Sequence, residues 1–552
     1  MKILWLDINS SYSHSSVALP AIHAQVSDRT EWDWCVVRGT INDDPGALAA
    51  AVAKEEPDLI AATLWLFTHQ MQIEVLSRAV ALLDNVKVVC GGPEFLGDNE
   101  SFLRSHEFIT AIIKGEGEIA LPKFLEAIES PATWQAIEGL CWIENNDGTY
   151  HDNGIARVAD FASLKYPEES QFFKWDKPFV QLETTRGCFN TCAFCVSGGE
   201  KPVRYQSLEQ VAARLANIYA HGIKDVRVLD RTFNYDPQRA CEMLDLFQQY
   251  AGKMRFHLEI HPSLISDILK AKLSSLPKGL LHLEAGIQSL DSEVLSESGR
   301  KGSLKSSLEG LQYLCSLDNI EVHADLIAGL PSYTLDMLCK DICKLVEIGV
   351  DELQVESLKV LPGTQMRLMA KDKGLRYSPL PPYEILKTSS MSPQELKRAM
   401  KVSRMLDFYY NTSAWQKLTK TLICNEANFI ELFTDHLDNI MVLDSPLSLE
   451  RRGTILYEYC KSNYPELLSE ISVAWIEAGY SLKKEPAGNV TKIKHLDAYL
   501  AENNCQLSVE YGQLSSSHRY YLLTASDKSV IFGYDAQTHQ PSPVLRASLA
   551  FK

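Results

Sequence analysis

Three cysteines lie close together in the stretch TTRGCFNTCAFCVSGGEK (184–201) and could bind a metal. They are Cys188, Cys192 and Cys195, with the spacing C-x3-C-x2-C. Structural zinc sites and four-iron clusters ordinarily take four protein ligands. Three thiolates on a four-iron cluster leave one iron without a protein ligand. An open position of this kind is where a substrate or cosubstrate binds.

A structural zinc knuckle is the alternative, and it needs a fourth cysteine or histidine nearby. His221 is the nearest histidine downstream, and it falls in a predicted helix. The spacing therefore favours a [4Fe-4S] cluster. The other ten of the thirteen cysteines are scattered along the chain, and without a signal peptide they predict reduced thiols.

The composition describes a large chain with several hydrophobic cores. Its 552 residues are 45% hydrophobic and 23% charged, and the formal net charge is −17. This charge, without a Lys/Arg run, argues against a nucleic-acid partner. Asp7 interrupts the N-terminus too early for a signal peptide, and the longest apolar run, 59–67, is far below the ~20 residues of a membrane helix. We therefore expect a cytoplasmic protein of several domains without a membrane partner.

Residues 1–137 alternate apolar strands with amphipathic helices. Strands are expected at 2–8, 32–38, 58–66, 86–92 and 109–115. This alternation predicts a doubly wound, Rossmann-like α/β domain with a parallel sheet and helices on both faces. Ligands of such sheets bind beyond the carboxyl ends of the strands.

A hairpin and a linker are expected at 138–177, and a second alternating series follows them. Its strands are predicted at 179–185, 226–230, 256–260, 280–289, 322–331 and 353–363. Six strands with helices between them predict a partial (β/α)6 TIM-like barrel over 178–374, with the cysteine loop after its first strand. Beyond Gly374 the pattern predicts a C-terminal α+β domain, 375–552, which we expect to cap the barrel and select the substrate.

At the cysteine loop the sequence resembles the radical S-adenosylmethionine (radical SAM) superfamily. Gly187 before the first cysteine and Phe194 before the last also match this family. The resemblance implies that S-adenosylmethionine chelates the open iron and that reduction cleaves it to a 5′-deoxyadenosyl radical. The family's Gly-Gly-Glu occurs here at 198–200, directly after the loop, whereas the second strand ends in Asp230 and Arg231. One of these two residues is therefore expected at the equivalent position.

Polar residues and glycine at the other strand ends extend this resemblance. EAGIQS (284–289) resembles the family's ribose-binding strand, and ADLIAGLP (324–331) resembles its adenine-side segment. The resemblance thus implies that S-adenosylmethionine is bound by Phe194, Asp230, Glu259, Glu284, Gln288, Ser289 and Gly329.

An α/β domain directly before such a barrel resembles the cobalamin-binding domain of cobalamin-dependent radical SAM enzymes. The matching letters are GGP (91–93) and GEGE (115–118), whose glycines let backbone approach a corrin ring. The first loop, DINSSY (7–12), lacks the histidine that ligates cobalt in Asp-x-His-x-x-Gly, although His14 and His69 are nearby. The resemblance implies that cobalamin is bound by Asn9, Thr63, Gly91, Gly92, Gly115 and Gly117.

These features together predict a cobalamin-dependent radical SAM enzyme, most simply a methyltransferase acting on an unactivated centre. Its partners would be a small-molecule or peptide substrate and an electron donor such as flavodoxin or ferredoxin. One alternative is a radical SAM enzyme of another reaction type, such as cyclisation, rearrangement or thiomethyl modification of RNA, whose N-terminal domain does not use cobalamin. The other is a non-enzymatic corrinoid or redox sensor.

Overall fold

The computed structural model describes residues 1–144, 146–426, 428–524, 529–535 and 543–551. The chain forms two compact units. The first consists of Met1–Asp341, Ile348–Asp351 and Val355–Ala399. The second consists of Ile342–Glu347, Glu352–Gln354 and Met400–Lys552. Residues 375–399 thus belong to the first unit, where Ile385 packs against Gly329, and the rest of the segment after Gly374 belongs to the second.

The N-terminal half of the first unit is built on a seven-stranded sheet of order β2-β1-β3-β4-β5-β6-β7. The first five strands along the chain pair in parallel, and the last two are antiparallel. The order 2-1-3-4-5 is that of a doubly wound fold, as the sequence predicts. The strands are β1 (Lys2–Asn9), β2 (Asp33–Thr40), β3 (Leu59–Thr63), β4 (Lys87–Gly91), β5 (Ala111–Ile113), β6 (Leu140–Ile143) and β7 (Tyr150–Asp152).

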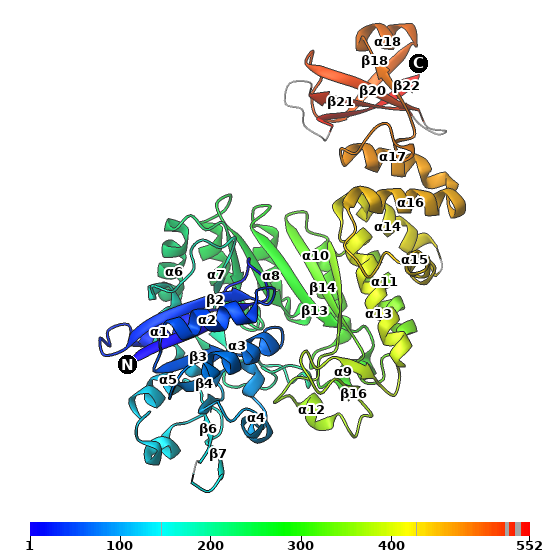
Figure 1. The fold of residues 1–552 in the computed structure, drawn as a ribbon. Helices are drawn as coiled ribbons and strands as arrows, with labels where there is room; N and C mark the ends of the chain where they lie inside the picture. The colour runs from blue at the N-terminus through cyan, green and yellow to red at the C-terminus, as the bar shows by residue number, and fades with distance from the viewer. Residues whose placement is uncertain (145, 427, 525–528, 536–542, 552) are drawn as a thin grey trace. The chain divides into compact units, whose positions relative to one another are not determined.

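Helices cover both faces of this sheet, shown in blue in Figure 1. Alternate residues of β1 point to opposite faces, so Ile3 and Trp5 join one core while Leu4 and Leu6 join the other. The first core includes α1 (Ala18–Val26) and α5 (Gly117–Glu126). The second includes α2 (Pro45–Lys54), α3 (His69–Ala81) and α4 (Glu100–Ser105).

A six-stranded sheet of order β15-β14-β13-β12-β11-β8 follows, and it confirms the predicted partial barrel. Neighbouring strands from β8 to β14 pair in parallel. These strands are β8 (Val180–Leu182), β11 (Asp225–Val228), β12 (Arg255–Ile260), β13 (Leu281–Gln288), β14 (Ile320–Ala328) and β15 (Glu352–Ser357).

Helices alternate with the barrel strands, and local signals begin several of them. Ser207 and Gln210 form a capping box at α6, and Asp236 caps α7 ahead of Pro237. The helices are α6 (Leu208–Ala220), α7 (Pro237–Gln248), α8 (Asp267–Ser274), α9 (Ser292–Glu297), α10 (Leu304–Cys315), α11 (Leu335–Ile348), α12 (Gln365–Met369) and α13 (Pro393–Met405). Two short antiparallel pairs complete this region: β9 (Thr185–Arg186) with β10 (Arg204–Tyr205), and β16 (Arg376–Tyr377) with β17 (Ile385–Lys387).

The second unit combines helices with a small sheet of order β18-β20-β21-β22-β19. Its helices are α14 (Ser413–Asn425), α15 (Phe429–Asn439), α16 (Leu449–Asn463), α17 (Leu468–Glu477) and α18 (Leu496–Glu502). Its strands are β18 (Asn489–Ile493), β19 (Cys505–Tyr511), β20 (His518–Thr524), β21 (Ser529–Asp535) and β22 (Leu545–Phe551). The helices α16 and α17 are separate, because Pro465 interrupts the helical pattern between them.

Short helical turns join these elements: η1 (Pro93–Phe95), η2 (Pro131–Ala136), η3 (Phe161–Ser163), η4 (Pro167–Glu169), η5 (Pro262–Leu264), η7 (Pro465–Leu467) and η8 (Glu485–Ala487), with the π-helix η6 (Leu406–Tyr410). None of the helices in the described ranges has the length and apolarity needed to span a membrane.

Candidate active site

The cysteine loop connects β9 to β10 and leaves the barrel beyond the carboxyl end of β8. Cys188 and Cys192 are buried, Cys195 is half-buried, and all three thiols are free. Backbone bonds fold the loop on itself: Cys188 N donates to the Glu200 carbonyl at 3.0 Å, and Gly198 N donates to the Cys195 carbonyl at 3.0 Å. A Cβ at Gly198 would lie 2.5 Å from the Cys192 carbonyl oxygen, so only glycine fits there.

The spacing of the three sulfurs can be compared with that of a single-ion site. Around one tetrahedral zinc, thiolates with Zn–S bonds of about 2.3 Å lie roughly 3.8 Å apart. In the described part of the chain, the sulfurs of Cys188, Cys192 and Cys195 do not all lie within 4.8 Å of one another. The loop is therefore wider than a preformed single-ion site, and a cluster of several irons, whose ligands lie farther apart, is compatible with it.

Burial raises the pKa of the Cys192 and Cys195 thiols, and nearby Arg300 and Arg231 oppose this shift. A bound metal would reverse the balance, since coordination deprotonates a thiol outright. The two arginines thus place positive charge near sulfurs that become anionic as ligands.

A segment that the sequence analysis did not assign braces the cysteine loop. It is Ser298–Lys301, after α9, here called the brace segment. The Ser298 carbonyl accepts from Ala193 N at 2.8 Å, and the Gly299 carbonyl accepts from the Thr191 hydroxyl at 2.9 Å. Lys301 N donates to the Asn190 side chain at 2.8 Å, and the Asn190 amide donates back to the Lys301 carbonyl at 3.1 Å.

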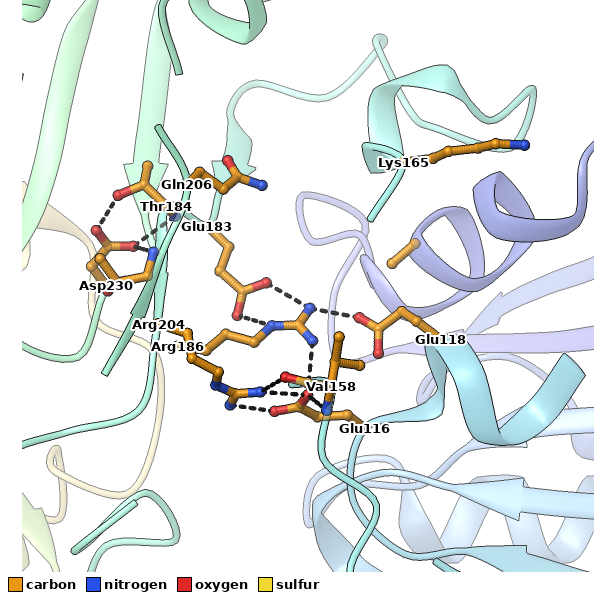
Figure 2. Close-up of polar contacts among 12 residues, drawn as sticks. Glu116, Glu118, Val158, Lys165, Glu183, Thr184, Arg186, Arg204, Gln206 and Asp230 are labelled. Carbon is orange, nitrogen blue, oxygen red and sulfur yellow. Dashed lines mark hydrogen bonds and ion pairs between the residues drawn. The ribbon is translucent and has the colours of Figure 1, made fainter. Parts of the chain in front are cut away.

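Asp230, predicted to contact S-adenosylmethionine, joins the first two barrel strands. Its side chain is buried, and Oδ1 accepts from the backbone N–H groups of Thr184 and Thr185 at 2.8 Å each. Oδ2 accepts from the Thr184 hydroxyl, as Figure 2 shows. Both oxygens therefore have protein partners. Arg231, the neighbouring candidate, lies 3.8 Å from Glu259.

Glu259 and Glu284 face each other across β12 and β13. Burial raises the pKa of Glu259 to about 7, with Glu284 and Asp325 adding to the effect while Arg231 opposes it. A hydrogen bond from His257 at 2.9 Å lowers the pKa of Glu284. Glu259 can therefore carry a proton near neutral pH, whereas Glu284 stays ionised.

The remaining predicted S-adenosylmethionine residues have different environments. Gln288 ends β13 with φ of 71°, beside an irregularity in the pairing with β14. Ser289 is buried and donates to Asp341 at 3.1 Å, so its hydroxyl serves a hydrogen bond to α11. Gly329 has φ of 87°, and a Cβ there would lie 2.7 Å from Ile385. Phe194 is half-buried in the cysteine loop.

A cavity of about 390 Å³ lies between the strand ends of the N-terminal sheet and the barrel. Its wall contains five of the six residues assigned to cobalamin from sequence: Thr63, Gly91, Gly92, Gly115 and Gly117. The barrel contributes Gly187 and Ser197, on either side of the cysteines, and Arg231. The structure thus brings the residues assigned to cobalamin next to the two ends of the cysteine loop, whereas the cysteines and the residues predicted to bind S-adenosylmethionine are not among those that line this cavity.

Two glycines of this wall are also required by the backbone around them. Gly92 and Gly115 have φ of 108° and 106°, and a Cβ at either would lie 2.4 Å from a backbone oxygen, of Leu64 and Ala156 respectively. The backbone itself therefore requires glycine at both positions, and their contact with cobalamin stays a prediction. Gly91 differs, because a Cβ would meet only Ile113, at 3.5 Å or more.

Asn9, His14 and His69 are not among the residues that line the cavity. The Asn9 amide donates to Asp7 at 3.1 Å. His14 Nδ1 lies 2.7 Å from the Ser11 hydroxyl, and His69 Nδ1 lies 2.8 Å from Glu94 Oε2. Within the described part of the chain, the lining includes no histidine to ligate a metal in the cavity.

Ion pairs join the N-terminal domain to the barrel at this wall (Figure 2). Arg204 binds both carboxylate oxygens of Glu116, at 2.6 and 2.9 Å, and also contacts Glu200 at 2.7 Å. Arg186 lies between Glu118, at 2.5 Å, and Glu183, at 2.9 Å. Burial alone would raise the pKa of Glu116, but Arg204, the Val158 N–H and Arg186 hold it below its ordinary value. The two carboxylates of GEGE thus join the N-terminal domain to the barrel, and Glu200 of Gly-Gly-Glu adds a partner to Arg204.

Residues 182–342 match the radical SAM superfamily, a match that covers the cysteine loop and the strands around it. These residues form a radical SAM domain. Residues 371–481 match a second family, described as a protein of unknown function (DUF4080).

Curated relatives of this radical SAM protein include methyltransferases. An uncharacterised methyltransferase of Pyrococcus horikoshii is 24% identical over 350 residues, which cover 61% of this chain and 75% of the relative. The cobalamin-dependent radical SAM methyltransferase TokK of Streptomyces tokunonensis is also 24% identical over 350 residues, covering 59% of this chain. The chain spans only half the length of TokK.

Solved structures show the same fold. The radical SAM methyltransferase TsrM of Kitasatospora setae, determined with cobalamin and a [4Fe-4S] cluster, has a TM-score of 0.55 at 17% identity over 72% of this chain and 81% of its own. The cobalamin-dependent radical enzyme OxsB, determined with aqua-cobalamin and S-adenosylmethionine, has a TM-score of 0.61 at 13% identity over 88% of this chain and 82% of its own. The fold class predicted from sequence is therefore confirmed.

Proposed function

We propose that this protein is a cobalamin-dependent radical SAM methyltransferase. In this proposal Cys188, Cys192 and Cys195 hold a [4Fe-4S] cluster, S-adenosylmethionine binds beside it, and cobalamin occupies the cavity. One observation carries the proposal: the cavity wall combines strand ends of the N-terminal sheet with residues on both sides of the cysteines. A ligand on the N-terminal sheet would therefore lie next to the cysteine loop.

The cavity suits part of a large, flat, mostly apolar ligand. Its volume of about 390 Å³ is within the range of small-molecule sites, so a corrinoid would extend beyond it. The side of the cavity formed by the sheet is lined by the small residues Ala61, Ala62 and Gly91. Larger side chains there would exclude a corrin ring. Charged side chains line the opposite side and could bind amide groups, among them Glu116, Arg157 and Arg186.

The two cofactors would supply radical generation and methyl transfer. The protein's own residues would position them. The brace segment fixes the cysteine loop, Asp230 joins the first two barrel strands, and the Glu116–Arg204 pair sets the distance between the two halves of the cavity wall. Arg231 lines the cavity near Cys195 and Glu259, where it could orient an anionic group of a ligand.

The substrate is proposed to be a small molecule or a peptide, in keeping with TsrM, which has been determined with tryptophan bound. An electron donor such as flavodoxin or ferredoxin is also required by the proposed reaction. The role of residues 375–552 in selecting the substrate stays a prediction.

The test is cobalamin binding by anaerobically reconstituted protein, followed by visible spectroscopy and cofactor extraction. Wild type should retain about one cobalamin per chain. Gly91→Leu should lose cobalamin but keep four irons, because the new side chain fills the cavity from a position where its Cβ causes no clash.

Ala51→Leu is the matched control, since it adds the same side chain to an exposed position of α2 in the same domain. It should bind cobalamin as wild type does. Wild type that binds no cobalamin but cleaves S-adenosylmethionine would instead favour a radical SAM enzyme whose N-terminal domain does not use cobalamin.

A further inference from the structure

The brace segment places one charged side chain, Arg300, against the cysteine loop. Arg300 Nη1 donates to Cys192 Sγ at 3.5 Å, within the range of hydrogen bonds to sulfur. Its Nη2 donates to the carbonyl of Gly286 on β13. The planar guanidinium is thus held at both ends, one on a predicted cluster ligand and the other on a barrel strand.

The charge of Arg300 is not neutralised by a neighbour. Among the described residues, no carboxylate forms an ion pair with it. His261, which packs beside the same loop, does not share the charge, because burial and Arg300 itself lower its pKa to about 3. Among the described residues, Arg300 is thus the cation that hydrogen-bonds to Cys192.

The backbone around Arg300 gives it little freedom to move. Residues on both sides of it bond to the cysteine loop: Gly299 accepts from Thr191, and Lys301 bonds with Asn190 in both directions. Gly299 also has φ of 67°, and a Cβ there would lie 2.7 Å from the Thr191 carbonyl. The contact of the guanidinium with the sulfur is therefore built into the fold.

We propose that Arg300 is a positioning residue that sets the reduction potential of the cluster through Cys192. This inference rests on the cluster of the proposed function. Reduction adds one negative charge to the cluster, and hydrogen bonds and charge near its sulfurs determine the potential. A cation donating to a ligand sulfur stabilises the more negative, reduced state. Arg300 therefore raises the potential and eases electron transfer from the donor.

Thr232 provides a matched control. Its hydroxyl oxygen lies 3.8 Å from Cys188 Sγ, but the hydroxyl donates to the Arg231 carbonyl at 2.7 Å. Its proton is therefore used elsewhere, and it brings no charge to the sulfur. Thr232→Val should leave the potential unchanged.

The experiment compares wild type, Arg300→Met, Arg300→Lys and Thr232→Val after anaerobic reconstitution of the full chain. Iron and sulfide are counted first, and a potentiometric titration monitored by electron paramagnetic resonance follows, without S-adenosylmethionine. We expect Arg300→Met to make reduction about tenfold less favourable, a shift of about 59 mV to more negative potential for one electron. Arg300→Lys keeps the positive charge but cannot donate to Cys192 and Gly286 in the same way, so it should shift the potential less.

The outcomes separate this inference from the proposed function. A wild type without four irons would overturn both. An Arg300→Met variant with a full cluster and an unmoved potential would overturn only the role of Arg300. If Arg300→Met assembles no cluster, Arg300→Gln takes its place, because it also removes the charge, and a full cluster with an unmoved potential in that variant would overturn the role of Arg300.

Discussion

The buried carboxylate of Asp230 offers a sharp test of how the first two barrel strands are joined. Its Oδ1 accepts from two backbone N–H groups, those of Thr184 and Thr185. Asp230→Ala would leave both donors buried without an acceptor. At about 1–3 kcal/mol for each unsatisfied group, this variant should lose roughly 2–6 kcal/mol of unfolding free energy. Asp230→Asn keeps one carbonyl oxygen for both donors, so it should be far less destabilised.

The ionisation of Asp230 adds a pH dependence of known sign. Burial raises its pKa from 3.8 to about 6, although Thr184 and Thr185 oppose the shift. Because the pKa of Asp230 is higher in the folded than in the unfolded protein, its protonated form stabilises the fold. This contribution to the free energy of unfolding is fully present below about pH 4 and is lost as the pH rises through 6. At 1.36 kcal/mol per pKa unit, the change amounts to about 3 kcal/mol.

Equilibrium urea unfolding of wild type, Asp230→Ala and Asp230→Asn at several values between pH 4 and 7 measures both the loss of the acceptor and the pH dependence. Asn cannot ionise, so the free-energy difference between wild type and Asp230→Asn should change by about 2 kcal/mol in favour of Asn between pH 4 and 7. Asp230→Ala should be the least stable throughout. A pH-independent difference, or an Asp230→Ala variant as stable as Asp230→Asn, would show that the carboxylate does not join these strands. Loss of S-adenosylmethionine binding in a stable Asp230→Asn would show that the carboxylate serves the ligand.

Two further predictions concern the cofactors. Cys192→Ala should abolish four-iron absorbance and 5′-deoxyadenosine formation. Cys241→Ala, in α7 away from the loop, should keep both. Reductive cleavage of S-adenosylmethionine by Cys192→Ala would exclude the assigned ligand set. Gln288→Ala should weaken S-adenosylmethionine binding by about 1–3 kcal/mol in an anaerobic titration, since it removes a polar partner at the end of β13. An unchanged affinity would place the ribose contact on another residue.

The alternation of elements and the cysteine loop were predictable from sequence because both depend on residues close together in the chain. The apolar runs at 2–8 and 86–92 became β1 and β4 within two residues, since the burial of each strand follows its own side-chain pattern. C-x3-C-x2-C likewise predicts three thiols in one loop, whatever surrounds it.

Tertiary structure decided what those local elements touch. Asn190 and Lys301 are 111 positions apart, and Glu116 and Arg204 are 88 apart, so no local pattern links them. The letters GGP and GEGE predicted a ligand cradle, yet Gly92 and Gly115 are required by their own backbone, and Glu116 binds the barrel. Side-chain periodicity reports which face of an element is buried. Which partner lies on that face, and whether a polar group such as Asp230 or Arg300 meets the protein or a ligand, is determined only when distant segments pack together.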